Sequence, residues 1–260
     1  MRFQGKTAVI TGGAKGFGQA FATALAEEGC RVILVDVDQD QLKASAQAIG
    51  RLRGGSASAE ARVCDVTDKG QVTELMAHVL ESYGAIDILI NNAGGSMGVP
   101  KVPIEDVSEA DWDRVVALNL KGTFLCTQAA ARPMKEARQG KIVNLASLAA
   151  RIGGQMTPVQ YCTAKGGVVA FTRHVAQELG PFGINVNAVA PGLVLTGERI
   201  QNMWYGRNDA QEREKFINRI PLGRLAEVDE VTRIVVFLCS AEASYLAGVT
   251  LDVNGGMFSP

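Results

Sequence analysis

Short runs of apolar and β-branched residues recur along the chain, and longer stretches with a helical spacing of apolar residues separate them. Compact apolar runs bounded by turn-forming residues are typical of strands buried in a sheet. The runs that fit this pattern are Thr7–Thr11, Arg31–Val35, Ala61–Cys64, Ile86–Ile90, Lys141–Leu145, Asn185–Val189 and Val249–Val253.

The stretches between these strand candidates are amphipathic, as expected for helices that cover a sheet. We predict helices over Gln19–Glu28, Gln39–Arg51, Gln71–Ser82, Asp111–Arg132 and Pro158–Leu179. Strands that alternate with helices form right-handed crossovers and hence a parallel sheet. The pattern therefore predicts an α/β, doubly wound fold, in which a seven-stranded parallel sheet is flanked by helices on both faces. The small-residue stretch Gly54–Ala59 is predicted to be a surface loop.

The length and composition favour one domain over residues 1–260. A chain of 260 residues with 47% hydrophobic content can bury a large core, and no Pro/Ser-rich linker or internal repeat divides it. The most irregular segment, Gly192–Arg219, follows a strand candidate, carries Met203, Trp204 and Tyr205, and then resumes a helical spacing. We predict that it is a substrate lid. An ordinary pair of surface helices is the alternative.

The charge balance argues against a nucleic-acid or membrane partner. The chain has 26 basic and 27 acidic residues and a formal net charge of -1, so it lacks the basic surface of nucleic-acid binders and polybasic membrane segments. No apolar run approaches the ~18 residues that span a bilayer, and the first residues lead into a strand rather than a signal peptide. We expect a cytoplasmic protein whose partner is a small molecule.

The cysteines predict neither a disulfide framework nor a metal site. Their number is odd, they are widely separated without a Cys-x-x-Cys pair, and the chain has only 2 histidines to complete a ligand set. We expect reduced, mostly buried thiols at Cys30, Cys64, Cys126, Cys162 and Cys239.

A glycine-rich turn directly follows the first strand candidate. Gly12, Gly16 and Gly18 lie where this strand passes into a helix, in a longer variant of the G-x-G-x-x-G spacing. Glycine allows the backbone to approach a pyrophosphate, and the helix N-terminus offers unpaired N–H groups and the positive end of its dipole. The context predicts a dinucleotide site.

Two charged residues bear on which dinucleotide binds. Asp36 ends the second strand candidate, where a carboxylate can accept hydrogen bonds from the adenine-ribose hydroxyls and would repel a 2′-phosphate. Lys15 favours the opposite choice, because an ammonium before the second glycine could reach a 2′-phosphate. Lys15 is one flexible, solvated charge, so we expect Asp36 to outweigh it and the protein to prefer NAD to NADP.

The second half of the chain contributes candidate acid/base chemistry. Tyr161 and Lys165 are four residues apart in a predicted helix and therefore share one of its faces. A neighbouring ammonium favours a phenolate and lowers its pKa from about 10. Ser147 follows a strand candidate at the sheet edge where ligands bind. Asparagine is unfavourable in the interior of a regular helix. Asn119 therefore predicts a local distortion of the helix, in which a carbonyl group binds water.

Together these residues resemble the short-chain dehydrogenase/reductase family, whose fold is Rossmann-like, and the resemblance spans nearly the whole chain. It rests on the glycine turn, Asp65, the sequence Asn91-Asn92-Ala93-Gly94, Asn119, Ser147 with Tyr161-x-x-x-Lys165, and Pro191-Gly192 followed by Val194 and Thr196. It implies a catalytic centre of Asn119, Ser147, Tyr161 and Lys165. It also implies cofactor contacts from Gly12, Lys15, Gly16, Phe17, Gly18, Asp36, Asp65, Val66, Asn92, Ala93, Gly94, Tyr161, Lys165, Pro191, Gly192, Val194 and Thr196.

The resemblance further implies how these residues work. Tyr161 would exchange a proton with the substrate oxygen, Lys165 would hold the nicotinamide ribose and lower the pKa of the tyrosine, Ser147 would polarise the carbonyl, and Asn119 would anchor a water chain. A homotetramer is implied, with the Val249–Pro260 tail near a subunit contact. The spacing from Ser147 to Tyr161 is one residue longer than the family pattern, and a loop insertion there should reshape the substrate pocket.

The substrate itself stays open. We expect pocket walls from Gly95–Val99, Leu148–Val159 and Leu193–Tyr205, and we expect water to face at least two of the three wall arginines, Arg151, Arg199 and Arg207. The first hypothesis is NAD-dependent interconversion of a secondary alcohol and its ketone. The alternatives are an NADPH-dependent 3-oxoacyl thioester reductase and a non-catalytic cofactor-sensing protein. Retention of the full catalytic set disfavours the last, although fold alone does not fix function.

Overall fold

Parallel strands form one central sheet in the computed structural model, which describes residues 1–153, 157–207 and 209–259. Within these residues the strand order is β3-β2-β1-β4-β5-β6-β7, and every neighbouring pair is parallel. This confirms the predicted doubly wound α/β fold. The strands are β1 (Thr7–Thr11), β2 (Arg31–Asp36), β3 (Ala59–Val63), β4 (Ile88–Asn91), β5 (Gly140–Leu145), β6 (Ile184–Pro191) and β7 (Thr250–Val253).

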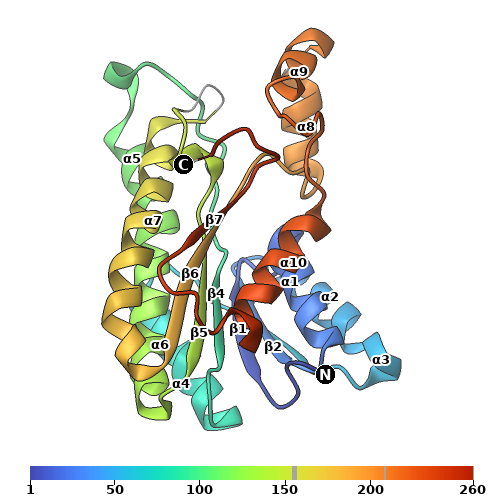
Figure 1. Cartoon of the computed structure of the whole chain (residues 1–260), viewed down its shortest axis with the longest axis vertical. Coiled ribbons are helices and arrows are strands. Elements are labelled where there is room, and N and C mark those ends of the chain that lie inside the picture. Colours follow the sequence, from blue (N-terminus) through green and yellow to red (C-terminus); the bar gives the residue numbers. More distant parts are fainter. Residues whose placement is uncertain (154–156, 208, 260) are drawn as a thin grey trace.

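Helices cover both faces of this sheet. In Figure 1, α4, α5, α6 and α7 lie on one side and α1, α2 and α10 on the other, while α8 and α9 project beyond one end of the strands. The helices are α1 (Gly16–Glu27), α2 (Gln39–Gly50), α3 (Leu52–Gly55), α4 (Lys69–Tyr83), α5 (Glu109–Val116), α6 (Gly122–Ala137), α7 (Val159–Leu179), α8 (Glu198–Arg207), α9 (Ala210–Ile217) and α10 (Val228–Cys239).

The alternation of side chains along the central strands builds two cores. Ile10 and its sheet neighbour Leu34 pack with Phe21 of α1 on one face. The intervening Val9 packs on the other face with Leu125 of α6. Successive side chains of a strand point to opposite faces, so a sheet covered on both sides favours apolar residues on both faces of its strands. This requirement explains why these strands appear in the sequence as continuous apolar runs.

Two predicted segments differ in detail. The helix predicted over Asp111–Arg132 is interrupted by a π-helical turn at Ala117–Lys121, centred on Asn119. The predicted distortion therefore exists. The predicted surface loop Gly54–Ala59 begins inside α3 and ends on the first residue of β3, because Ala59 pairs with Val32 at the sheet edge.

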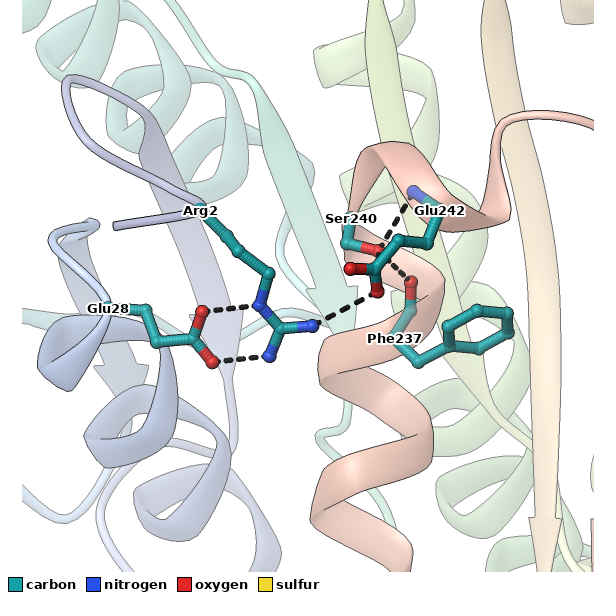
Figure 2. A network of polar contacts seen from close by, with 5 residues as sticks. All are labelled: Arg2, Glu28, Phe237, Ser240 and Glu242. Atoms are coloured by element: carbon teal, nitrogen blue, oxygen red, sulfur yellow. Dashed lines mark hydrogen bonds and ion pairs between the residues drawn. The ribbon is translucent and has the colours of Figure 1, made fainter.

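Ion pairs link the start of the chain to residues that follow two helices (Figure 2). The Arg2 guanidinium forms a two-pronged ion pair with Glu28, the residue after α1, and also reaches Glu242, which follows α10. The Ser240 hydroxyl contacts the carboxylate of Glu242 and donates to the Phe237 carbonyl. These groups are partly exposed, so their contribution to stability is modest. Their effect is to hold α1 and α10 together at the N-terminal end of β1.

The carboxyl ends of the parallel strands lie at the same edge of the sheet. The strand order reverses between β1 and β4. Such a reversal opens a crevice, and ligands of doubly wound sheets bind there. No helix in the described part of the chain has the length and apolarity to cross a membrane. The same described residues contain no cluster of three or more His, Cys, Asp or Glu side chains able to hold a metal ion.

Candidate active site

A cavity of about 1050 Å³ occupies this edge of the sheet. Its wall is built from the loops after β1 to β6, the helices α8 and α9, and the C-terminal segment. Every residue that we predicted to bind cofactor or to act in catalysis contributes to this wall, apart from Gly18 and Asn119. The fold thus gathers residues that lie far apart in the sequence around one space.

The glycine turn presents the start of α1 to the cavity. Gly12 and Gly16 have φ angles of 64° and 60°, a region that favours glycine. Lys15, the N-cap of α1, makes no side-chain cap, and the first turn contains no acidic residue. The helix N-terminus therefore keeps N–H groups and a positive dipole end for an anion. Gly18 acts differently, because a Cβ there would lie 2.0 Å from the Gly12 carbonyl oxygen.

Asn92 holds the glycine turn in place. Its side-chain amide donates to the carbonyls of Thr11 and Gly12 at 2.9 and 3.0 Å. The Thr11 hydroxyl in turn accepts from the backbone N–H groups of Asn92 and Ala93, both at 3.0 Å. The loops after β1 and β4 are consequently locked together across the strand reversal.

Carboxylates line the end of the cavity above β2 and β3. Asp36 accepts from the backbone N–H groups of Ala14, Val37 and Asp38 at 2.8 to 3.2 Å. The ammonium of Lys15, whose side chain is 72% exposed, lies 3.6 Å from the carboxylate of Asp38. The lysine charge is thus partly balanced by an acidic neighbour. In the loop after β3, the Asp65 carboxylate accepts from the backbone N–H and hydroxyl of Thr67 at 2.9 and 2.8 Å.

Ser147 and Tyr161 contribute hydroxyl groups to the middle of the wall. Ser147 lies two residues beyond β5, and its Oγ accepts from the Ala149 N–H at 3.1 Å, which starts a short 3₁₀ turn. Tyr161 is the third residue of α7, a helix of 21 residues. The N-terminal end of a helix stabilises negative charge. Tyr161 thus lies at the helix end whose dipole is positive.

Lys165 lies one turn further along α7. Its Nζ donates to the Leu145 carbonyl at 2.6 Å and lies 5.8 Å from the centre of the Tyr161 ring. The side chain is buried, and this burial lowers the pKa of the ammonium from 10.5 to about 8. The cation therefore persists at neutral pH, close to the phenol.

The burial of Lys165 predicts a measurable pH dependence of stability. Because the folded pKa lies below the unfolded one, the unfolded chain binds more protons, and the wild-type protein should gain stability as pH rises from about 8 toward 10.5. The full shift corresponds to about 3 kcal/mol. Lys165→Met has no ammonium to desolvate. We expect the Tm of the cofactor-depleted wild type to rise relative to that of this variant between pH 8 and 10 in thermal melts, whereas a constant difference would contradict the assignment.

Asn119 lies behind the wall rather than in it. Its Oδ1 accepts from the Gly95 N–H at 2.9 Å, and its Nδ2 donates to the carbonyls of Gly95 and Val115 at 2.9 and 2.8 Å. A Cβ on Gly94 would lie 2.6 Å from the Asn119 Oδ1 and 3.1 Å from the Lys165 Nζ. The structure thus shows Asn119 clamping the glycine loop after β4. Its predicted water-binding role stays a prediction.

Arg151 is the one of the three expected wall arginines whose side chain the structure describes, and it faces a carboxylate rather than water, which our expectation for two of the three allows. Its guanidinium forms a bidentate pair with Asp252 of β7, at 3.0 and 3.1 Å, and lies 5.6 Å from the centre of the Phe258 ring. Both charged side chains are largely buried. Arg151 therefore ties the segment after Ser147 to the last strand. The side chains of Arg199 and Arg207, and residues 154–156 of the predicted insertion loop, lie outside the described residues.

The cavity walls that we predicted from the sequence were incomplete. The cavity is lined by residues from all three expected segments, but also by Leu118, Phe216, Arg219 and Met257. Phe216 packs against Trp204 with ring centres 5.4 Å apart, which joins α9 to α8. The helical spacing around Phe216 could have shown that it faces inward. Nothing local marks Met257, because only the path of the C-terminal segment after β7 brings it to the site.

Comparisons with known proteins agree with this geometry. A family model described as enoyl-(acyl carrier protein) reductase matches residues 12–258. The chain is 38% identical to galactitol 2-dehydrogenase of Agrobacterium fabrum, over 98% of both chains, and 37% identical to a 3-oxoacyl-[acyl-carrier-protein] reductase of Thermotoga maritima, over 99% of both.

A solved structure shows the same likeness. The structure of an NAD⁺-bound xylitol dehydrogenase aligns with a TM-score of 0.91 at 31% identity, over 98% of this chain and 100% of the other. With the family model, the relatives and the site geometry in agreement, the chain belongs to the short-chain dehydrogenase/reductase family of oxidoreductases.

Proposed function

We propose that the protein is an NAD-dependent oxidoreductase that interconverts a secondary alcohol and its ketone, with Tyr161 as the acid/base. One observation carries the proposal. The phenol of Tyr161 stands on the cavity wall at the N-terminal end of α7, with the buried Lys165 ammonium beside its ring. Galactitol 2-dehydrogenase, whose name describes oxidation of an alcohol, is consistent with this chemistry.

The residues present fit a nicotinamide dinucleotide. The uncapped start of α1 suits a pyrophosphate, and Gly94 leaves open a space that any Cβ would close against Asn119 and Lys165. When bound, the nicotinamide ring supplies the acceptor or donor of hydride. The glycine turn would hold the phosphates, Asp36 the adenine ribose, and Pro191, Gly192, Val194 and Thr196 the nicotinamide end.

The protein's own part is to move a proton and to fix the substrate. Tyr161 as phenolate accepts the hydroxyl proton of the alcohol, and as phenol it returns a proton to the ketone oxygen. Ser147 donates to the same oxygen and orients it. Lys165 would stabilise the phenolate and bond the ribose hydroxyls. Helices α8 and α9, within Gly192–Arg219, would act as the lid that excludes water.

The alternative, an NADPH-dependent 3-oxoacyl thioester reductase, is favoured by the Thermotoga maritima relative. The carboxylate of Asp36 on the cavity wall favours NAD instead, since it would oppose a 2′-phosphate. The homotetramer implied by the family stays a prediction.

The pH dependence of alcohol oxidation tests the proposal. The rate should rise with pH through an apparent pKa well below the roughly 10 of an isolated tyrosine, because the Lys165 ammonium favours the phenolate. The rising limb should move to higher pH in Lys165→Met. NAD reduction by simple secondary alcohols, measured as kcat/KM across pH 6 to 10 on both proteins, gives the two limbs. If Lys165→Met is active and its rising limb lies at the same pH as that of the wild type, the proposed electrostatic coupling between Lys165 and Tyr161 is disproved.

A further inference from the structure

The part of the cavity beyond Ser147 and Tyr161 is walled mainly by apolar side chains. They come from the loops after β4, β5, β6 and β7 and from the two projecting helices: Val99, Ile152, Leu193, Met203, Phe216 and Met257. Val99 is buried and the others are half-buried. These strands form the half of the sheet away from Asp36. The apolar wall therefore surrounds the place where a substrate meets the catalytic hydroxyls.

Among the residues that the structure describes on this side of the cavity, polar side chains are few or already engaged. Ser96 and Thr157 contribute hydroxyl groups to the wall, and the Thr157 hydroxyl contacts the Cys162 thiol at 3.1 Å. The charged side chains of Lys101, Glu198 and Arg219 are exposed, so they lie at the rim, and they carry both signs. A substrate rich in hydroxyl groups would find few partners, whereas an apolar ring would bury its surface.

A second, smaller cavity of about 90 Å³ adjoins this wall. Gly192, Leu193, Phe216 and Met257 line both cavities and so form the partition between them. The side cavity is otherwise mainly apolar, and its Arg224 and Glu230 pair with each other at 2.7 and 2.8 Å. Phe216 is the largest side chain of the partition and is braced by Trp204.

We propose that this site takes an apolar, ring-sized secondary alcohol or its ketone rather than a polyol, and that Phe216 sets the upper size of the substrate. The proposal rests on the proposed function, because it names the substrate class of that same site. A polyol has more hydroxyl groups than the described wall has polar partners for, and each hydroxyl group buried without a partner weakens binding roughly tenfold or more. Removal of the Phe216 ring would join the side cavity to the main one and admit a larger substituent.

The first experiment compares two alcohols on the wild-type protein. We expect kcat/KM with NAD to be at least about tenfold higher for cyclohexanol than for xylitol. A higher value for xylitol would overturn the substrate class and leave the proposed function standing. If neither alcohol is oxidised and cyclohexanone is not reduced with either cofactor, the proposed function fails, and this inference fails with it.

The second experiment tests the partition with Phe216→Ala, using 4-tert-butylcyclohexanol and cyclohexanol. The ratio of their kcat/KM values should move about tenfold toward the bulkier alcohol. Phe216→Leu should move it less, and Lys215→Ala, an exposed neighbour outside the wall, should leave it unchanged. Tm values of all four proteins establish that they fold. An equal loss for both alcohols in the Leu and Ala variants would show a merely structural role and overturn the assignment of Phe216.

Discussion

Tyr161→Phe should lower kcat for alcohol oxidation by roughly 10²–10⁴, the usual worth of a general acid/base, while NAD affinity stays close to that of the wild type. The substitution removes only the phenolic hydroxyl and keeps the ring that lies 5.8 Å from the Lys165 Nζ. The proton of the substrate then loses the acceptor that we propose for it. The pyrophosphate site at the start of α1 is untouched, so binding and chemistry should separate.

The measurement needs turnover and NAD binding from one preparation, for example by initial rates and titration calorimetry. Tyr245→Phe is a matched control, since Tyr245 is fully exposed and lies outside the cavity wall. The control should retain wild-type values of both quantities. Turnover of Tyr161→Phe within about threefold of the wild type would be incompatible with the role of Tyr161.

Asp36→Ala combined with Val37→Arg should invert the cofactor preference from NAD to NADP. The Asp36 carboxylate is held at the cavity by three backbone N–H groups, and Val37 beside it is 64% exposed. Removal of the carboxylate abolishes repulsion of a 2′-phosphate, and arginine supplies a planar donor for it. One interaction of about 1.4–3 kcal/mol changes the ratio of kcat/KM values by tenfold to more than a hundredfold.

The single variant Asp36→Ala should lower the ratio of kcat/KM with NAD to kcat/KM with NADP, but NAD should remain the preferred cofactor. Asp40→Ala, which removes an exposed charge in the first turn of α2 outside the wall, controls for net charge and should leave the preference unchanged. The readout is kcat/KM for both cofactors on one accepted alcohol. Equal values, or an advantage for NADP, in the wild type would show that Lys15 outweighs Asp36, and would favour the thioester reductase instead.

The sequence alone determined the order of strands and helices and the local geometry of the key motifs. Apolar runs and helical spacing are properties of neighbouring residues, so the strands and the helices α1, α2 and α4 to α7 could be predicted. The strand ends differ from the prediction by one or two residues everywhere except at β1, and α10 was not predicted. The glycine turn and the four-residue step from Tyr161 to Lys165 are equally local. Even the distortion at Asn119 followed from its poor fit to a regular helix.

Tertiary structure decided which residues face the cavity and in what state. Lys165 is desolvated because strands and helices from distant parts of the chain enclose it, and Asn119 clamps Gly95 instead of reaching the wall. The pairing of Arg151 with Asp252 joins residues 101 positions apart. Phe216 and Met257 meet at one partition only because the topology brings α9 and the C-terminal segment to the same edge. The periodicity of the sequence does not predict such contacts, because they depend on how the elements pack in space and not on which residues are neighbours in the sequence.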